Sequence, residues 1–408
     1  MSTASTNTGA NPVSAAPHAP AGEPVRRLPL FSLMVLATIG FLLVAMETMP
    51  AGLLPVIAEG LDTGEGTVGL LISAYALGTV VATVPAITLT RGMGRRRLLA
   101  IALTGLILAN TVTALAPGAG VALASRFVAG AFSGMIWGML AVHGRRISPP
   151  DRAGLSLSIV AAGTPVGFAF GTPLGSWLGT AFDWRWSFGG LTLLGVVVLA
   201  LVLTVVPDAT PEPAAARLSL GRVIRIPGVA LILAVIVTWM IGHNTIYTYI
   251  SPYLRAGGSG LGVDLTLLVY GVASIGGIAL TAASLDRHPR ALVHASVAVF
   301  VLAGVILLMA HASPVAVLVA TVLWGLGFGG AAAQLQDALT RTAGADADVA
   351  NAFLPVAFNV AIFAAGLVGA GLVGVTDGLV LPVLMIASGL VAFALTLRGR
   401  RTAFRSDG

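Results

Sequence analysis

The chain has 408 residues, of which 57% are hydrophobic and 9% are charged, and its formal net charge is +6. A water-soluble domain carries about 25% charged residues, so this composition excludes a large water-soluble surface. The absence of cysteine excludes disulfides and thiolate metal sites, and the arginines are too dispersed to form a nucleic-acid-binding patch.

Long apolar runs follow a polar N-terminal segment that we expect to be a disordered tail. No apolar core precedes Arg26, so this segment is not a signal peptide. Each run approaches the ~20 residues that a helix needs to cross a bilayer. In the first half we expect helices at about 29–57, 67–90, 98–116, 120–142, 154–180 and 187–206. In the second half we expect them at about 228–252, 264–285, 291–311, 314–336, 350–374 and 378–397. The predicted fold class is an all-α membrane protein with twelve transmembrane helices.

These runs divide the chain into two comparable halves. We expect a cytoplasmic tail at 1–27, a six-helix bundle at 28–206, a central cytoplasmic loop at 207–227, a second six-helix bundle at 228–398 and a second tail at 399–408. The loops after the second and eighth helices echo each other weakly. Such duplication is common in transporters, whose substrate site lies between the halves near the membrane midplane.

The basic residues indicate the orientation of the chain. All 22 are arginine, and nearly all fall before the first helix, after even-numbered helices, in the central loop or in the tail. Only Arg185 and Arg255 occupy loops on the other side. Because basic loops remain in the cytoplasm, we expect both termini to be cytoplasmic. Arginine in place of lysine, with many Ala, Gly and Val residues, suggests a bacterium, so we expect a bacterial plasma membrane.

Glu47 is the only acid deep inside an apolar run. It lies about 17 residues into the first helix, or roughly 26 Å along its axis. A charge at such depth costs on the order of 2.5–3.5 kcal/mol on insertion scales. Arg126, a few residues into the fourth helix, lies at a similar depth, so the two side chains are candidates for a proton-coupling pair. The alternative is a static ion pair that fixes helix packing.

The fifth helix carries a ladder of glycines at four-residue spacing, with two prolines that interrupt its hydrogen bonds. Small residues on one ridge allow another backbone to approach closely. We expect this ridge to form a bendable contact between the two halves; the alternative is a close-packed helix pair without a role in transport. The ladder comprises Gly163, Gly167, Gly171, Gly175 and Gly179, with Pro165 and Pro173 between them.

Polar and aromatic residues of the seventh helix are candidates for a substrate cavity. His243 and Tyr247 share one helix face, with Asn244 beside them. Asn359 and Asn110 lie in the middle of other helices, and for each the alternatives are a ligand contact and a helix–helix hydrogen bond. Trp137 and Trp324 complete the candidate cavity, although buried tryptophans more often serve packing than binding. Gln334, Gln336 and Asp337 are candidate gate residues at the cytoplasmic end of the tenth helix.

No arrangement of residues indicates an enzyme or a cofactor. A nucleophile–base pair and a metal-ligand cluster are not visible, and the phosphate-binding loop motif requires a lysine. We therefore expect no cofactor and no metal, with an ion gradient as the energy source.

Several motifs resemble the twelve-helix drug:proton antiporter family of the major facilitator superfamily, over nearly all of residues 28–398. Glu47–Pro55 is similar to the first-helix motif of bacterial chloramphenicol-resistance and arabinose-type sugar efflux proteins. Arg126–Gly130 resembles the R-x-x-x-G motif of the fourth helix, which implies a role for Arg126 in proton transfer. Gly167–Gly175 resembles the exporter motif of the fifth helix. Residues 183–188 and 247–252 also match this subgroup.

One loop departs from the family pattern. The family loop after the second helix reads G-x-x-x-D-R-x-G-R, and here Thr90 takes the place of the acid before Arg91, Gly94 and Arg95. The acid is retained in the second-half copy, which comprises Asp286, Arg287 and Arg290.

The resemblance implies a proton-coupled efflux antiporter that contributes to multidrug resistance by alternating access. Its partners would be a small amphiphilic drug or metabolite, protons and the lipid bilayer, and a monomer would suffice. One alternative is an exporter of sugars, nucleosides or amino acids with the same mechanism. A different class is a non-transporting membrane sensor, which needs no coupling acid.

Overall fold

The computed structural model describes residues 28–89, 93–208 and 223–404. Within these ranges all regular structure is helical, and twelve helical spans are long and apolar enough to cross a membrane. The predicted fold class, an all-α membrane protein of twelve spans in two bundles, is therefore confirmed. Exposed leucines within the helices, such as Leu108, Leu193 and Leu302, suit a surface that faces lipid.

The first half contains α1 (Leu30–Gly52), α2 (Leu54–Gly60), α3 (Glu65–Leu89), α4 (Arg95–Ala114), α5 (Ala119–Arg146), η1 (Pro150–Arg152), α6 (Ala153–Ala161), α7 (Gly163–Val166), the π-helical η2 (Gly167–Gly171), α8 (Thr172–Ala181) and α9 (Trp184–Val205). The second half contains α11 (Val229–Thr248), α12 (Ile250–Gly257), α13 (Val263–Ser284), α14 (Pro289–Met309), α15 (Pro314–Gly329), α16 (Ala331–Ala343), η3 (Gly344–Asp346), α17 (Ala347–Asn351), α18 (Phe353–Val375), α19 (Leu381–Arg398) and η4 (Gly399–Arg401).

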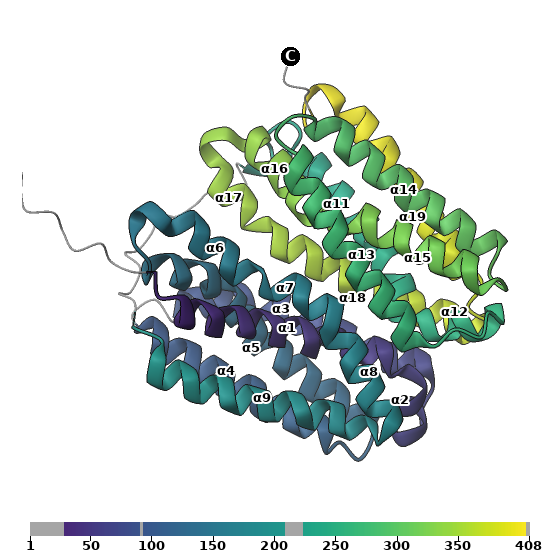
Figure 1. Cartoon of the computed structure of the whole chain (residues 1–408), viewed down its shortest axis with the longest axis horizontal. Helices are drawn as coiled ribbons and strands as arrows, with labels where there is room; N and C mark the ends of the chain where they lie inside the picture. The colour runs from purple at the N-terminus through teal and green to yellow at the C-terminus, as the bar shows by residue number, and fades with distance from the viewer. Residues whose placement is uncertain (1–27, 90–92, 209–222, 405–408) are drawn as a thin grey trace, which may run out of the picture.

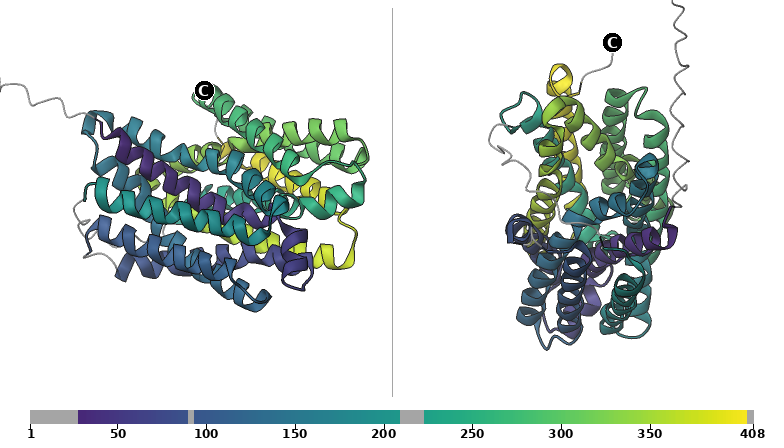
Figure 2. Two further views of the ribbon diagram at one scale, coloured as in Figure 1. Left: turned by 60° about the horizontal axis from the view of Figure 1, so that its bottom comes forward. Right: turned by 90° about the vertical axis from the view of Figure 1, so that its left-hand side faces the viewer.

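The helices of the two halves form two groups, purple to teal and green to yellow in Figures 1 and 2. We call the face where α1 begins and α19 ends the terminal face, and the face that carries α2 and α12 the distal face. The halves meet along two lines: α3 packs against α18, and the segments α7, η2 and α8 pack against α13. We call this contact surface the seam.

Several predicted helices are broken in the structure. The first ends at Gly52 and resumes as α2 after Leu53, between Pro50 and Pro55. The fifth is divided into α6, α7, η2 and α8, and its π-helical turn comes directly before Pro173. Proline has no N–H to donate, so the regular i→i−4 pattern fails at these points. Similar breaks at Tyr249 and Gly330 were not predicted.

Two apolar clusters fill the interior. One lies entirely within the first half, among α1, α4, α5 and α9. The other begins near the distal end of α1, with Met49 and Leu53, and continues into the second half around Trp239 and Trp324. Because the second cluster contains residues of both halves, apolar packing holds them together toward the distal face.

Candidate functional site

The candidate site centres on Arg126 of α5, which is completely buried. Its Nη2 donates to the backbone carbonyl oxygen of Glu47 at 3.1 Å, and its Nε lies 3.4 Å from the carbonyl oxygen of Leu71. Its guanidinium carbon lies 4.4 Å from the centre of the Tyr75 ring, a cation–π contact. The structure thus brings together the two residues expected to form the coupling pair.

The contact differs from a simple ion pair. Arg126 binds the backbone of Glu47, and among the described residues no ion pair joins its guanidinium to the Glu47 carboxylate. Oε1 of Glu47 and Nη1 of Arg126 are both buried without a hydrogen-bond partner in this part of the chain. Buried polar atoms without partners are rare and costly. The site therefore retains unused capacity to bind a proton or to form a direct pair.

Close packing between α3 and α5 positions Arg126. A Cβ on Gly130 would collide with the backbone carbonyl of Tyr75, and a Cβ on Gly78 would collide with that of Phe127. Glycine at both positions lets the two backbones touch. Because Gly130 lies one turn after Arg126, it holds the guanidinium against Tyr75 and α1. This gives a physical reason for the R-x-x-x-G spacing.

A buried aromatic cluster surrounds His243 in the second half. The His243 ring stacks on Phe328, with centroids 3.6 Å apart, and its Nδ1 accepts a hydrogen bond from Nε1 of Trp324 at 3.0 Å. Tyr247 and Tyr270 lie edge-on at 5.5 Å and both contact Trp324. Of the predicted cavity residues, the structure therefore brings His243, Tyr247 and Trp324 into one cluster.

A chain of hydroxyl groups joins this cluster to α1. Tyr247 donates its O–H to Oγ1 of Thr172 at 3.1 Å, and Thr172 lies 2.7 Å from Oγ1 of Thr48. Thr48 directly follows Glu47 and donates to the carbonyl of Val44 at 2.8 Å. All three hydroxyl side chains are buried. The chain crosses from the second half to the first beside the candidate coupling residues.

The glycine ladder does not form the seam, so that prediction is wrong. The ladder faces α1 within the same half: a Cβ on Gly163 would collide with the carbonyl of Ala37, one on Gly167 would lie 2.9 Å from the Cβ of Val44, and one on Gly175 would lie 2.6 Å from Sδ of Met49. Gly171 packs against Ala45 in the same way, and Pro173 opens α8. The spacing defines which residues share a ridge, but not which helix that ridge meets.

The opposite side of the same helix forms the seam. A Cβ on Gly271 of α13 would collide with Ala169, which lies in η2 among the glycines. The rings of Phe168 and Tyr247 make an edge-to-face contact, with their centroids 6.3 Å apart. The fifth helix thus binds α1 with its glycines and the second half with the residues between them.

Further contacts across the seam lie toward the distal face. Arg255 of α12 forms an ion pair with Glu65 of α3 at 2.7 Å. The hydroxyl of Tyr249 donates its one proton toward two carbonyls, that of Gly366 at 2.9 Å and, more distantly, that of Gly66 at 3.3 Å. Ser73 of α3 donates to the carbonyl of Phe363 at 3.2 Å. These contacts fasten α3 to α12 and α18 at this end of the molecule.

The remaining predicted cavity residues are more scattered. Asn244 is partly exposed and donates to the carbonyl of Met240 in its own helix. Asn359 donates to the carbonyl of Pro355, and its Oδ1 is buried without a partner among the described residues. Trp137 packs on the apolar cluster of the first half. Asn110 makes the helix–helix contact that was one of its two expected roles: it donates to the Phe188 carbonyl and to Thr192 of α9 at 2.8 and 3.0 Å, while its Oδ1 is buried without a partner among the described residues.

The loop motif is only partly described. Arg91 and Thr90 lie outside the described residues, whereas Arg95 is the first residue of α4 and Gly94 is its N-cap. The carboxylate of Asp208 accepts the backbone N–H of Arg96 at 2.9 Å, so an acid from the end of the first half caps this helix. In the second-half copy, Asp286 and Arg287 are exposed, and Arg290 lies in the first turn of α14.

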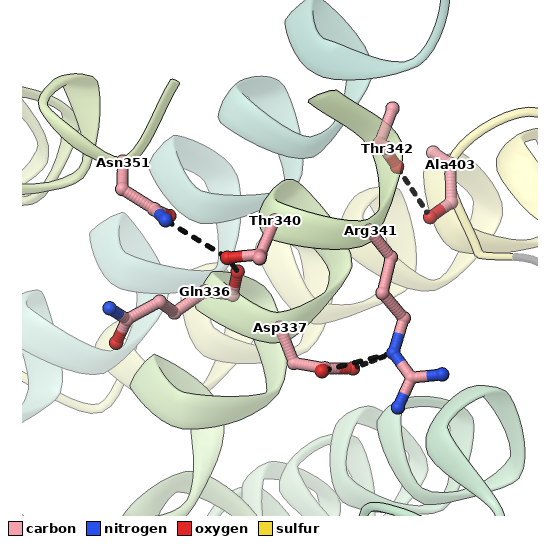
Figure 3. A network of polar contacts seen from close by, with 7 residues as sticks. All are labelled: Gln336, Asp337, Thr340, Arg341, Thr342, Asn351 and Ala403. Atoms are coloured by element: carbon pink, nitrogen blue, oxygen red, sulfur yellow. Dashed lines mark hydrogen bonds and ion pairs between the residues drawn. The ribbon is translucent and has the colours of Figure 1, made fainter. Parts of the chain in front are cut away.

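Polar contacts at the terminal face of the second half, near the candidate gate residues, are drawn in Figure 3. Arg341 binds Asp337 at 2.8 Å, and Asn351 donates to Thr340 at 2.9 Å. Thr340 in turn donates to the Gln336 carbonyl. Gln334 is buried and donates to Thr281 and Ser296. All these contacts lie within the second half, so they stabilise that half and do not form a bridge across the seam.

Several residues of the site were missed by sequence reasoning. Aromatic residues and threonines are common in apolar helices, so their presence alone did not indicate a site. The missed residues are Tyr75, Tyr270, Phe328, Trp239, Thr48 and Thr172. Only the position of Thr48 next to Glu47 provided a signal. The others become visible when the register between helices is known.

Two groups of six membrane-spanning helices, which meet beside a fully buried arginine and an acid with one buried carboxylate oxygen, are typical of polytopic membrane transporters. A family model described as Major Facilitator Superfamily matches residues 36–366. The chain therefore belongs to the Major Facilitator Superfamily and is a multi-pass membrane transporter.

Similar proteins support this assignment. Two proteins named chloramphenicol efflux pump, from Mycobacterium tuberculosis strains CDC 1551 / Oshkosh and ATCC 25618 / H37Rv, are each 32% identical over 83% of this chain and 84% of their own length. A crystal structure of a mutant of the nucleoside transporter NupG is similar with a TM-score of 0.74 at 11% identity, covering 91% of this chain and 99% of that chain. The structural likeness at this identity shows the fold alone.

Proposed function

We propose that this transporter is a proton-coupled efflux antiporter that exports a small amphiphilic drug or metabolite by alternating access. The observation that carries the proposal is the Glu47–Arg126 site. A carboxyl group with a free buried oxygen lies beside a fully buried guanidinium that also has a free nitrogen. Intramembrane ionisable groups are expensive, and they commonly mark proton relays.

In the proposed cycle, Glu47 is the proton carrier and Arg126 is its electrostatic partner. Burial favours the neutral carboxyl group, whereas the positive guanidinium favours the charged carboxylate. These opposing influences keep both states within reach. When Glu47 is neutral, Arg126 binds the backbone carbonyl, as in this structure; when Glu47 is charged, the guanidinium binds the carboxylate directly.

The aromatic cluster supports an amphiphilic substrate. Apolar and aromatic side chains with a few polar groups are typical of small-molecule sites, and His243, Tyr247 and Trp324 provide both kinds of contact. The similar proteins named chloramphenicol efflux pump make chloramphenicol the first compound to test.

We further propose that the terminal face lies in the cytoplasm of a bacterium, because most arginines of the loops lie there. Under that orientation, the contacts of Glu65, Tyr249 and Ser73 lie toward the outside. The structure then represents the state in which the outer side is closed. Export requires these contacts to break.

The test is transport by the purified protein in liposomes with an imposed pH gradient, first for chloramphenicol and then for a panel of amphiphilic drugs, sugars, nucleosides and amino acids. We expect uptake into inverted vesicles that a protonophore abolishes. Glu47→Gln should abolish gradient-driven transport, whereas Glu59→Gln, at an exposed position of α2, should transport normally. Gradient-driven transport by Glu47→Gln would refute the role of this carboxyl group.

The same panel separates the alternatives. Transport restricted to sugars, nucleosides or amino acids would replace the proposed substrate class and leave the mechanism intact. Binding of a compound without any transport or proton movement would identify a membrane sensor.

A further inference from the structure

We propose that the hydroxyl chain Tyr247–Thr172–Thr48 links the state of Glu47 to the seam, so that protonation in the first half controls its contact with the second half. This inference rests on the proposed role of Glu47 as the proton carrier. It adds three positioning residues that do not themselves carry the proton.

The donor and the acceptor of each hydrogen bond in the hydroxyl chain follow from the last bond, between Thr48 and Val44. Thr48 donates its only hydroxyl proton to the Val44 carbonyl, which cannot donate in return. Thr48 must therefore accept from Thr172, and Thr172 must accept from Tyr247. The Tyr247 proton thus crosses from the second half to the first, the Thr172 proton points to α1, and the Thr48 proton points back along α1 to Val44. Such aligned hydrogen bonds polarise one another and act as a unit.

Arg126 acts on the same peptide group that begins the chain. The carbonyl of Glu47, which accepts from Arg126, and the N–H of Thr48 belong to one planar peptide unit. A move of the guanidinium from this carbonyl to the free carboxylate oxygen would release that peptide. The position of Thr48, and with it that of Thr172 and Tyr247, therefore depends on which acceptor on Glu47 the arginine binds.

The hydroxyl chain Tyr247–Thr172–Thr48 also affects how readily the seam opens. If the halves separate at this point, the hydrogen bond from the Tyr247 O–H to Thr172 breaks, and both groups are left without this partner in the apolar surroundings of Phe168. An intramolecular hydrogen bond contributes about 0.5–1.5 kcal/mol, which corresponds to a roughly two- to tenfold change in an equilibrium. The intact chain therefore favours the closed seam by this factor.

Few other ionisable groups face this region. Arg126 of α5 and Tyr75 of α3 act electrostatically on Glu47 or on each other. His243 and Tyr247 come from α11, and Tyr270 comes from α13. Tyr247, Tyr270 and His243 are buried among aromatic rings, and Tyr75 is buried against the Arg126 guanidinium. Glu47 is therefore the group whose charge we expect to change during transport.

The experiment measures the distance between the halves at the distal face as a function of pH. Since the chain has no cysteine, Glu59→Cys in α2 and Ala312→Cys before α15 provide two unique exposed sites for spin labels. Double electron–electron resonance on the full-length protein in liposomes reports the populations of closed and separated states. No substrate is needed, because protons alone should shift these populations.

In this labelled background, Glu47→Gln should abolish the dependence on pH. Tyr247→Phe and Thr172→Val should raise the separated population about two- to tenfold at one pH and reduce its swing between acidic and alkaline pH by at least about threefold. Thr172→Ser retains the hydroxyl and should restore the response. The matched control is Tyr253→Phe, which removes a buried hydroxyl that donates to Leu307 within the second half at 2.7 Å.

The outcomes separate the two proposals. If the labelled parent shows no dependence on pH, or if Glu47→Gln retains it, the proposed coupling role fails and the inference falls with it. If the parent and Glu47→Gln behave as expected but Tyr247→Phe matches Tyr253→Phe, the hydroxyl link alone is refuted. A shift in population with an unchanged response to pH would also refute it, because that pattern indicates only a structural role.

Discussion

Replacement of Gly130 by alanine tests the packing that positions Arg126. The added methyl group would collide with the Tyr75 carbonyl, which is part of the α3 backbone and cannot rotate away. Overpacking of this kind costs about 1–3 kcal/mol. We therefore expect α5 to move away from α3 and to draw Arg126 away from the backbone of Glu47.

The matched control is Gly138→Ala in the same helix. A Cβ at Gly138 meets no atom within 4 Å, and the position is exposed. In a helix interior, alanine is favoured over glycine by about 0.8–1.0 kcal/mol, so this variant should be as stable as the parent or more stable. Gly130→Ala gains the same helix propensity, so the two variants should differ by the overpacking cost of about 1–3 kcal/mol in the free energy of unfolding.

The assay is denaturant unfolding of the purified protein in detergent, combined with transport in liposomes. Gly130→Ala should unfold at lower denaturant concentration and transport poorly, whereas Gly138→Ala should do neither. If Gly130→Ala matches Gly138→Ala in stability and transport, the close approach of α3 and α5 does not position the arginine, and our reading of the R-x-x-x-G spacing is wrong.

Three further predictions concern contacts away from this packing. Glu65→Gln removes an ion pair whose arginine side chain is 58% exposed, so the free energy of unfolding should fall by less than about 1 kcal/mol; a larger loss in denaturant unfolding would show that the pair contributes more than an exposed one. Asn110→Leu removes two hydrogen bonds between α4 and α9. It should lower the free energy of unfolding by about 0.6–1.7 kcal/mol and leave substrate affinity unchanged. A changed affinity in a binding assay would support the alternative role of this residue as a ligand contact. Gln334→Leu leaves the hydroxyls of Thr281 and Ser296 without this donor; it should cost about 1–3 kcal/mol in thermal or denaturant unfolding, and unchanged stability would argue against its role in joining α16, α13 and α14.

The sequence was sufficient to predict the twelve spans because a bilayer imposes a length and a polarity on each of them. It also indicated Glu47 and Arg126, since a charge inside an apolar run is conspicuous. It could not show that Arg126 binds the backbone of Glu47 instead of its carboxylate. That detail depends on the depth and rotation of α5 relative to α1, which no residue pattern within one helix determines.

The glycine ladder illustrates the same limit. Four-residue spacing correctly places Gly163, Gly167 and Gly171 on one ridge, but this ridge faces α1 and not the second half. Tyr75 and Thr172 were overlooked for a related reason. A tyrosine or threonine in an apolar helix is unremarkable until its neighbours from other helices are known.

The glycine contacts have a mechanical consequence. With backbone pressed against backbone at Gly163 and almost no side-chain volume between them at Gly171, α1 and the segments from α7 to α8 cannot slide past each other without a collision. They therefore move as one rigid unit, which includes Glu47, Thr48 and Thr172. When the halves separate, this rigid unit must therefore leave α13 and α11 as one body. A covalent cross-link between residues 45 and 171, which both lie within the unit, should leave transport unimpaired.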